Sequence, residues 1–280
     1  MDRIRPAAVA GSFYPSETEE LGRLIDECFE SNPLGPQGAR SPSPSLIGGL
    51  VPHAGYIYSG PCAAHFYALL NNPIERVILL GVNHQARGHR AALSPADFWQ
   101  TPLGTVRIDR ELNHLLQDAV RFLKQDEVAH AREHSIEVQL PFLQRAIGEF
   151  SLIPISLAHI SIEECLELGT AVADVLRNRQ SGTRTVIIAS SDLSHYLSPK
   201  ETAELDGIAL EQVLALNPRA LIEAAERENI TMCGLLPTAV LLFAANLLGA
   251  KQACLLKHCH SGDIAPMRKV VGYASVALEL

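Results

Sequence analysis

Apolar runs alternate along the chain with longer segments in which apolar residues recur every three or four positions. The near-continuous runs predict buried strands at 46–51, 76–82, 151–157 and 184–191, followed by strands at 252–260 and 270–280. The helical spacing predicts helices at 60–71, 109–124, 134–147, 161–178, 199–216, 217–228 and 235–248. Asp109 should cap the helix that it opens, and Pro141 should kink or split the helix around it.

This alternation indicates an α/β architecture, because a strand that is apolar on both sides must be covered by helices on both faces of its sheet. A hairpin predicted at 91–108, turning at 101–104, and the two C-terminal strands add antiparallel pairs. We therefore expect a single domain over residues 1–280, with a mostly parallel or mixed central sheet. Residues 33–45 are rich in Pro, Gly and Ser and are expected to form a mobile surface loop.

Composition narrows the class of partner. The 280 residues are 47% hydrophobic and carry a net charge of -8, with the basic residues scattered, which argues against nucleic acid or an anionic membrane. We find no targeting signal and no membrane-spanning window, so we expect a cytoplasmic protein. The six cysteines are dispersed and are expected to be free thiols. Phosphate-binding glycine motifs and the G-x-S-x-G motif are absent.

Polar residues follow three of the buried strands. His53 comes just after strand 46–51, His84 after strand 76–82, and Asp192 and His195 after strand 184–191. In α/β sheets, ligands bind beyond the carboxyl ends of the strands, so these side chains can meet in one cleft. His53 and His84 are candidate metal ligands; each could instead be a hydrogen-bonded loop histidine.

The segment 190–196 suggests acid/base chemistry. His195 is a candidate general acid or base, and Asp192 could orient it or act separately. The alternative is that the serines and Asp192 cap the turn that follows.

Two further segments carry candidate chemistry. His134 and Glu137, at i and i+3 with Glu133 adjacent, could share a metal or a hydrogen bond, or serve the helix start. Cys233 lies at a loop-to-helix junction, where a thiol acquires a lowered pKa and becomes a better nucleophile or soft metal ligand. The alternative for Cys233 is a small buried apolar residue.

The remaining cysteines and histidines suggest structural roles. His258 and His260 share one face of a predicted strand and Cys259 the other, which provides too few ligands for a metal and favours an exposed strand end. The other four cysteines fall in apolar patterns and are expected in the core: Cys28, Cys62, Cys165 and Cys254.

Taken together, these motifs resemble the Memo family, whose prokaryotic members are called AmmeMemoRadiSam system protein B. The resemblance covers roughly residues 5–280 and rests on RPAAVAGSFYP, VPHAGYIYSG, LGVNH, EHSIEVQLPFL, SSDLSHY, MCG and VVGYASVA. The fold of that family is similar to that of the class III extradiol dioxygenases, which hold Fe(II) with two histidines and a glutamate.

The resemblance assigns roles by motif. It implies that His53 and His84 are metal ligands and that Cys233 takes the place of the dioxygenase glutamate. It also implies that His195 is the acid/base residue beside Asp192, and that His134 lines the pocket. Sulfur with imidazole suits Fe(II) or copper, and zinc as well.

Two functions follow from this resemblance. The first is a metal-dependent redox enzyme, similar to a dioxygenase. The second is a non-catalytic module that binds a peptide or protein in the same cleft. We expect an unidentified small molecule or peptide as ligand, with no nucleic acid or membrane partner. The family name also implies a functional link to radical S-adenosylmethionine and AMMECR-type proteins.

Overall fold

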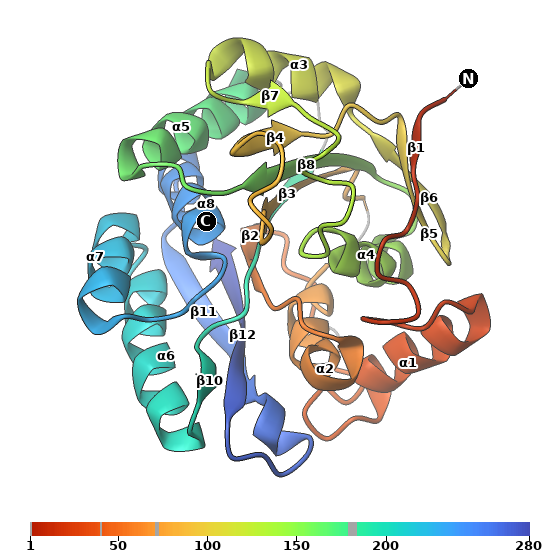
Figure 1. Ribbon diagram of the computed structural model, residues 1–280, viewed down its shortest axis with the longest axis vertical. Helices are drawn as coiled ribbons and strands as arrows, with labels where there is room; N and C mark the ends of the chain where they lie inside the picture. Colours follow the sequence, from red (N-terminus) through yellow and green to blue (C-terminus); the bar gives the residue numbers. More distant parts are fainter. Residues whose placement is uncertain (1, 40, 71–72, 179–183) are drawn as a thin grey trace.

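One mixed β-sheet organises the chain (Figure 1). The computed structural model describes residues 2–39, 41–70, 73–178 and 184–280. Within these ranges the sheet has 12 strands in the order β1-β5-β6-β8-β3-β9-β2-β12-β10, with β11 beside β12, and β4 beside β8 and β7. The strands are β1 Ile4–Arg5, β2 Leu46–Val51, β3 Arg76–Val82, β4 Ala91–Leu93, β5 Phe98–Thr101, β6 Gly104–Ile108, β7 Lys124–Gln125, β8 Ser151–Leu157, β9 Thr185–Ser190, β10 His195–Leu197, β11 Gln252–His260 and β12 Val270–Glu279.

The centre of the sheet is parallel and its margins are mixed, as the sequence predicted. Neighbouring strands along β6-β8-β3-β9-β2 run parallel, so their carboxyl ends lie at one edge. β12 pairs antiparallel with β2, β10 and β11, and β5 and β6 form the predicted hairpin.

Helices cover both faces of this sheet (Figure 1). Ile78 and Leu80 of β3 pack in one core with helices α3, α5, α6, α7 and α8, whereas Val77 and Leu79 pack in a second core with α1, α2 and α4. Successive strand side chains point to opposite faces, so an all-apolar strand feeds both cores. The helices are α1 Thr18–Glu30, α2 Tyr56–Tyr67, α3 Arg110–Ala119, α4 Leu140–Ile147, α5 Ile162–Asn178, α6 Pro199–Leu214, α7 Pro218–Glu228 and α8 Leu235–Leu248.

The predicted helices are present, but some of their boundaries are wrong: α2 begins at Tyr56 and not at 60, and α3 ends at Ala119 and not at 124. Asp109 caps α3 by accepting the N–H of Leu112. Pro141 divides the predicted helix 134–147: a 3-10 turn at Glu137–Gln139 precedes α4, and Pro141 lies in the first turn of α4, where no amide donor is needed. Helix α1 was not among the predicted helices, although its buried Leu21, Ile25 and Cys28 recur at helical spacing.

Residues 33–39 and 41–45 contain no helix or strand, and β2 follows directly after them. Residue 40 lies outside the described ranges. No described helix combines the length and apolar character that crossing a membrane requires.

The N-terminal motif is fixed to the 3-10 turn by a buried ion pair. Arg5 Nη1 lies 2.6 Å from Glu137 Oε2, both side chains are almost fully buried, and the guanidinium lies 4.0 Å from the Trp99 ring centroid. Glu137 also accepts hydrogen bonds from the Ala8 N–H and, at 2.6 Å, from the Tyr14 hydroxyl. Glu137 thus anchors the N-terminal segment, and the predicted sharing of a metal or hydrogen bond with His134 is wrong.

His130 lies in the same region and gives a pH-dependent prediction. It is buried, donates from Nε2 to the Ala92 carbonyl, and burial lowers its pKa to about 3 from 6.5. Between these values the unfolded chain binds a proton that the folded chain excludes, so this residue makes stability fall as the pH drops through that window.

We expect His130→Gln, which keeps a donor for Ala92 but cannot be protonated, to lose less stability on acidification than the unmodified protein. The slopes of the free energy of unfolding against pH should differ between the two proteins by up to about 1.4 kcal/mol per pH unit. Denaturant unfolding of metal-free protein at pH 4.5 and 6.5 measures it, and parallel pH dependences would contradict this role for His130.

Candidate metal centre

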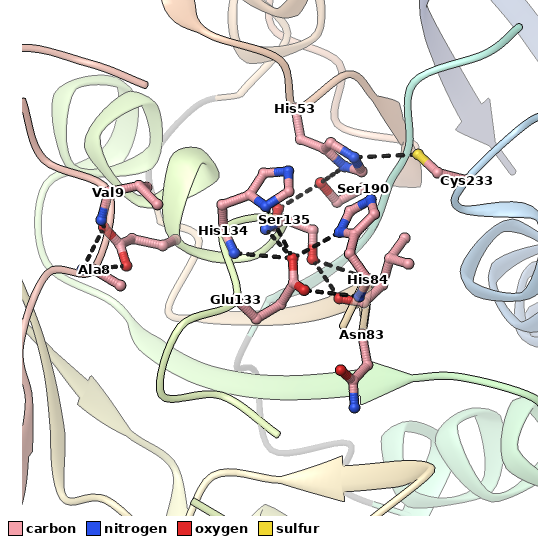
Figure 2. Close-up of polar contacts among 12 residues, drawn as sticks. Ala8, Val9, His53, Asn83, His84, Glu133, His134, Ser135, Ser190 and Cys233 are labelled. Carbon is pink, nitrogen blue, oxygen red and sulfur yellow. Dashed lines mark hydrogen bonds and ion pairs between the residues drawn. The ribbon is translucent and has the colours of Figure 1, made fainter. Parts of the chain in front are cut away.

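Two histidines and a cysteine converge at the carboxyl edge of the parallel strands. One nitrogen each of His53 and His84 and the sulfur of Cys233 all lie within 4.8 Å of one another. Figure 2 shows the His53 and His84 rings side by side, with the Cys233 sulfur facing His53. His53 is buried, Cys233 is half-buried and His84 is exposed, so the group is open on the His84 side.

The sheet order explains this convergence. β2 and β3 flank β9 on either side and run parallel to it, so His53 and His84 leave the sheet at the same edge. Cys233 directly precedes Gly234, the N-cap of α8. The N–H of Gly234 donates to Ser191 Oγ at 2.8 Å. A Cβ at Gly234 would lie 2.3 Å from that of Ser191, so only glycine allows this contact.

Hydrogen bonds select the tautomer of His53. Ser190 Oγ donates its single proton to the Ser135 carbonyl at 2.6 Å and accepts from Gln139 Nε2 at 2.7 Å. Its contact with His53 Nδ1 at 3.0 Å therefore requires an N–H on Nδ1. The lone pair of His53 remains on Nε2, which faces Cys233.

His84 is fixed in the same tautomer by a carboxylate. Its Nδ1 lies 2.9 Å from Glu133 Oε1, and its backbone N–H donates to Glu133 Oε2 at 2.8 Å. The pKa of Glu133 is lowered to about 2: burial alone would raise it, but the contacts with His84, His134 and Ser135 outweigh that effect. An ionised carboxylate can only accept, so His84 donates from Nδ1 and keeps Nε2 free for a ligand.

Glu133→Gln should weaken metal binding by about 10–100-fold, as expected for loss of a carboxylate that orients a ligating histidine. The carboxylate accepts four N–H groups, and a side-chain amide would turn one of its own donors toward one of them. Titration of chelated apoprotein with metal measures the affinity. The nearby exposed Glu127→Gln is the matched control, and equal affinities for the two variants would refute this function of Glu133.

His134 forms the wall of the group. Its ring stacks on His84 at 4.5 Å between centroids, and it belongs with His84 and Glu133 to a second set of close ligand atoms. Burial lowers its pKa to about 4, so it is neutral near pH 7. On its other side it lies against Phe13, at 4.4 Å between centroids.

Cys233 contacts His53 directly: Sγ lies 3.2 Å from Nε2, where the thiol proton meets the free lone pair. Burial and the nearby Asp192 raise the pKa of this thiol to about 12. The expected lowering at a helix start is therefore wrong for the metal-free protein, because desolvation outweighs the hydrogen bonds that lower the pKa. A bound cation would replace the thiol proton.

Asp192 and His195 have separate partners. Asp192 is buried and accepts the N–H groups of His53 at 2.8 Å and Ala54 at 3.3 Å, and burial raises its pKa to about 6. His195 instead places Nδ1 2.9 Å from the Thr231 carbonyl. Of the two possibilities for Asp192, these contacts favour the one in which it acts separately from His195. Ser191 Oγ accepts the N–H of Gly234 at the start of α8, and Ser198 caps α6.

His195 presents a free Nε2, because a carbonyl partner requires the proton on Nδ1. Burial lowers the pKa of His53 well below its usual value, and the neighbouring His134, His84 and His195 add to this effect. The next residue, Tyr196, is 69% exposed, has a positive φ of 60° and lies within an irregularity of the β10–β12 pairing. Such bulges redirect neighbouring side chains, here that of His195.

Four residues support the site in a way that their positions in the sequence did not indicate: Glu133, Gln139, Ser190 and Thr231. These residues fix the tautomers of the histidines, and such contacts cannot be predicted from the spacing of residues in the sequence. The one available signal was the adjacency of Glu133 to His134.

The segment 258–260 lies apart from this group. His258 Nε2 donates to the fully buried Asp206 at 2.9 Å, and Cys259 is buried, so the exposed strand end expected here is wrong. The expected core positions of Cys28, Cys62 and Cys165 are confirmed, whereas Cys254 is half-buried.

A cavity of about 790 Å³ lies beside the group and contains none of its three candidate ligands. It is lined by residues 11–16, by α1 and by the start of α2, including Phe13, Gly55 and Tyr58. Phe13 separates this cavity from His134.

The fold and site define an α/β protein with a candidate two-histidine, one-cysteine metal group at the carboxyl edge of its sheet. A family model described as "Memo-like protein" matches residues 5–277. The chain is 41% identical to a MEMO1 family protein of Methanopyrus kandleri, with 97% of this chain and 98% of that protein covered. It is 40% identical to one of Ignicoccus hospitalis, with 99% of each covered. The chain therefore belongs to the Memo family.

Among solved structures, the chain is similar to uncharacterized protein JW3007 from Escherichia coli K12, with a TM-score of 0.47 and 12% sequence identity. The match covers 76% of this chain and 88% of that one.

Proposed function

We propose that His53, His84 and Cys233 bind a redox metal ion, Fe(II) or copper, and that the protein is a metal-dependent oxidoreductase. The observation that carries this proposal is the shared tautomer of the two histidines. Ser190 and Glu133 each occupy an Nδ1, so that both imidazoles keep an Nε2 lone pair available close to the same thiol.

The donor set fits such an ion. Two imidazoles and a thiolate suit copper and iron, and they also suit zinc. Three protein ligands leave coordination positions for a substrate, and exposed His84 leaves the group accessible. A bound redox metal would supply one-electron transfer.

The surrounding residues have definable tasks. Glu133 and Ser190 keep the ligating nitrogens deprotonated, and Asp192 holds the backbone of the His53 loop. His195 Nε2 can accept a proton from a substrate or return it, because Thr231 holds the other nitrogen. Neutral His134 and Phe13 border the space beside the ligands.

Metal analysis of protein purified anaerobically with reductant tests the proposal. We expect about one iron or copper per chain after reconstitution. After oxidation of a copper-loaded sample to Cu(II), Cys233→Ser should lack the thiolate-to-copper absorption of the unmodified protein. Absence of iron and copper after incubation with Fe(II) and with Cu(I) would refute the proposal, and zinc alone would refute its redox part.

A second candidate function is a binding module for a peptide or small molecule. The cavity of about 790 Å³ favours it, because its lining excludes all three candidate ligands. A ligand that binds equally well to metal-free protein and to a variant without His53 and His84 would support this function.

A further inference from the structure

Two cysteines outside the metal group lie together between α2 and the sheet. Cys62 of α2 and Cys259 of β11 are both buried and form, with Tyr273 of β12, a small core cluster of their own. Cys62 Sγ lies 3.9 Å from the Lys257 carbonyl and 3.9 Å from Ser275 Oγ. The Cys62 sulfur is therefore directly over the β11–β12 pair.

The pairing of β11 with β12 places Cys259 on the face of these strands that Cys62 covers. Lys257 pairs with Ser275 and Cys259 with Tyr273, so Cys259 is one repeat further along β11, and side chains two residues apart point the same way. Both cysteines belong to the same three-residue buried cluster. A pair of thiols in contact is the arrangement from which a disulfide forms with little backbone movement.

We propose that Cys62 and Cys259 are a peroxide-sensitive dithiol that closes to a disulfide linking α2 to β11. This site is separate from the candidate metal ligands, and the proposal holds whether or not a metal binds.

The two cysteines differ in reactivity. Cys259 is 7% exposed and Cys62 is 0% exposed. The neighbouring Cys62 and the charge of Lys257 lower the pKa of the Cys259 thiol, whereas burial raises the pKa of Cys62 well above its usual value. Since the thiolate is the nucleophile, Cys259 reacts first and Cys62 resolves.

The chemistry uses a hydroperoxide as oxidant. The Cys259 thiolate attacks one oxygen of hydrogen peroxide, the O–O bond breaks, and the departing hydroxide takes up a proton to give water and a sulfenic acid. Cys62 then loses its proton, its sulfur attacks the Cys259 sulfur, and the S–O bond breaks to release a second water. Two thiols are oxidised by two electrons, and one peroxide is reduced to two waters.

The link would affect the neighbourhood of the metal group. Ala54 and Tyr58 pack against the cysteine cluster, and Ala54 follows His53. The disulfide would therefore fix the start of α2, and with it the His53 loop, to the C-terminal strands.

Peptide mapping of the full-length protein tests the proposal. Chelated protein is treated with hydrogen peroxide, blocked with an alkylating agent and digested with trypsin without reduction. The sequence separates the cysteines: Cys62 falls in peptide 41–76, Cys259 in 258–268 and the neighbouring Cys254 in 252–257. We expect peptides 41–76 and 258–268 to be linked, the link to disappear with dithiothreitol, and the titratable thiols to fall by two from six.

Variants test the order of events. Cys259→Ala should give no link, and Cys62→Ala should leave a sulfenic acid on peptide 258–268 that dimedone traps. Cys254→Ala, on the same strand, should still form the link. Free Cys62 and Cys259 after other thiols have oxidised would overturn the proposal, and so would a link between any other pair. Dimedone on Cys62 in the Cys259→Ala variant would overturn the assigned order.

Discussion

The double variant His53→Ala/His84→Ala should bind no measurable iron or copper. Each substitution removes one of the two imidazoles whose Nε2 faces the Cys233 sulfur, and a single half-buried thiol remains. The loss should exceed the ~10–100-fold that removal of a supporting contact costs, because the ligands themselves are gone. Elemental analysis after anaerobic reconstitution and gel filtration measures the bound metal.

A control must separate this loss from a general loss of histidine. His114 and His159 are exposed and lie outside both groups of close ligand atoms. The variant His114→Ala/His159→Ala should therefore keep the metal content of the unmodified protein. Equal metal content in the two double variants would place the bound metal elsewhere in the chain.

Arg5→Met should lower the free energy of unfolding by about 3–5 kcal/mol, the cost of leaving one member of a buried ion pair without its partner. The Glu137 side chain is completely buried, and Arg5 supplies its positive charge at 2.6 Å. Arg5 also donates to the backbone carbonyls of His130 and Glu133, which would lose these donors. Methionine fills a similar volume, so the measured loss reports charge and hydrogen bonding more than packing.

Urea unfolding measures this loss, and an exposed ion pair provides the comparison. Arg110 pairs with Asp97 at 2.6 Å, but its side chain is 56% exposed. Arg110→Met should therefore change stability by only about 0–1 kcal/mol. If Arg5→Met were as mild, the N-terminal motif would not depend on this pair, and its attachment would rest on Tyr14 and the backbone of Ala8.

The central fold followed from the sequence because its signals are local and strong. Strands that are apolar on both sides, such as β3 and β8, must be buried on both faces, and this alone specifies helices on each side. The elements that escaped prediction are short or carry weaker patterns. β1 and β7 are two residues long, and β10 is interrupted at Tyr196. Their pairing depends on partners far away in the sequence.

The candidate site was predictable to the level of which residues meet. Strand ends placed His53 and His84 at one edge, and the family resemblance added Cys233. The orientation of each histidine ring was not predictable, because it depends on hydrogen-bond partners that are distant in the sequence, such as Ser190 and Thr231. The thiol pKa was misjudged for a related reason: position relative to a helix can be read from sequence, whereas depth of burial cannot.

β12 pairs with two strands that position residues of the candidate site. Its C-terminal half pairs with β2, the strand that leads to His53, and its N-terminal half pairs with β10, the strand that begins at His195. Gly272 of the same strand exchanges hydrogen bonds with Leu193 and Ser194. The offset between the strand that precedes His53 and the strand that begins at His195 is therefore set by one continuous strand. An insertion of one residue in β12 would change this offset, because the side chains beyond it would turn to the opposite face of the sheet.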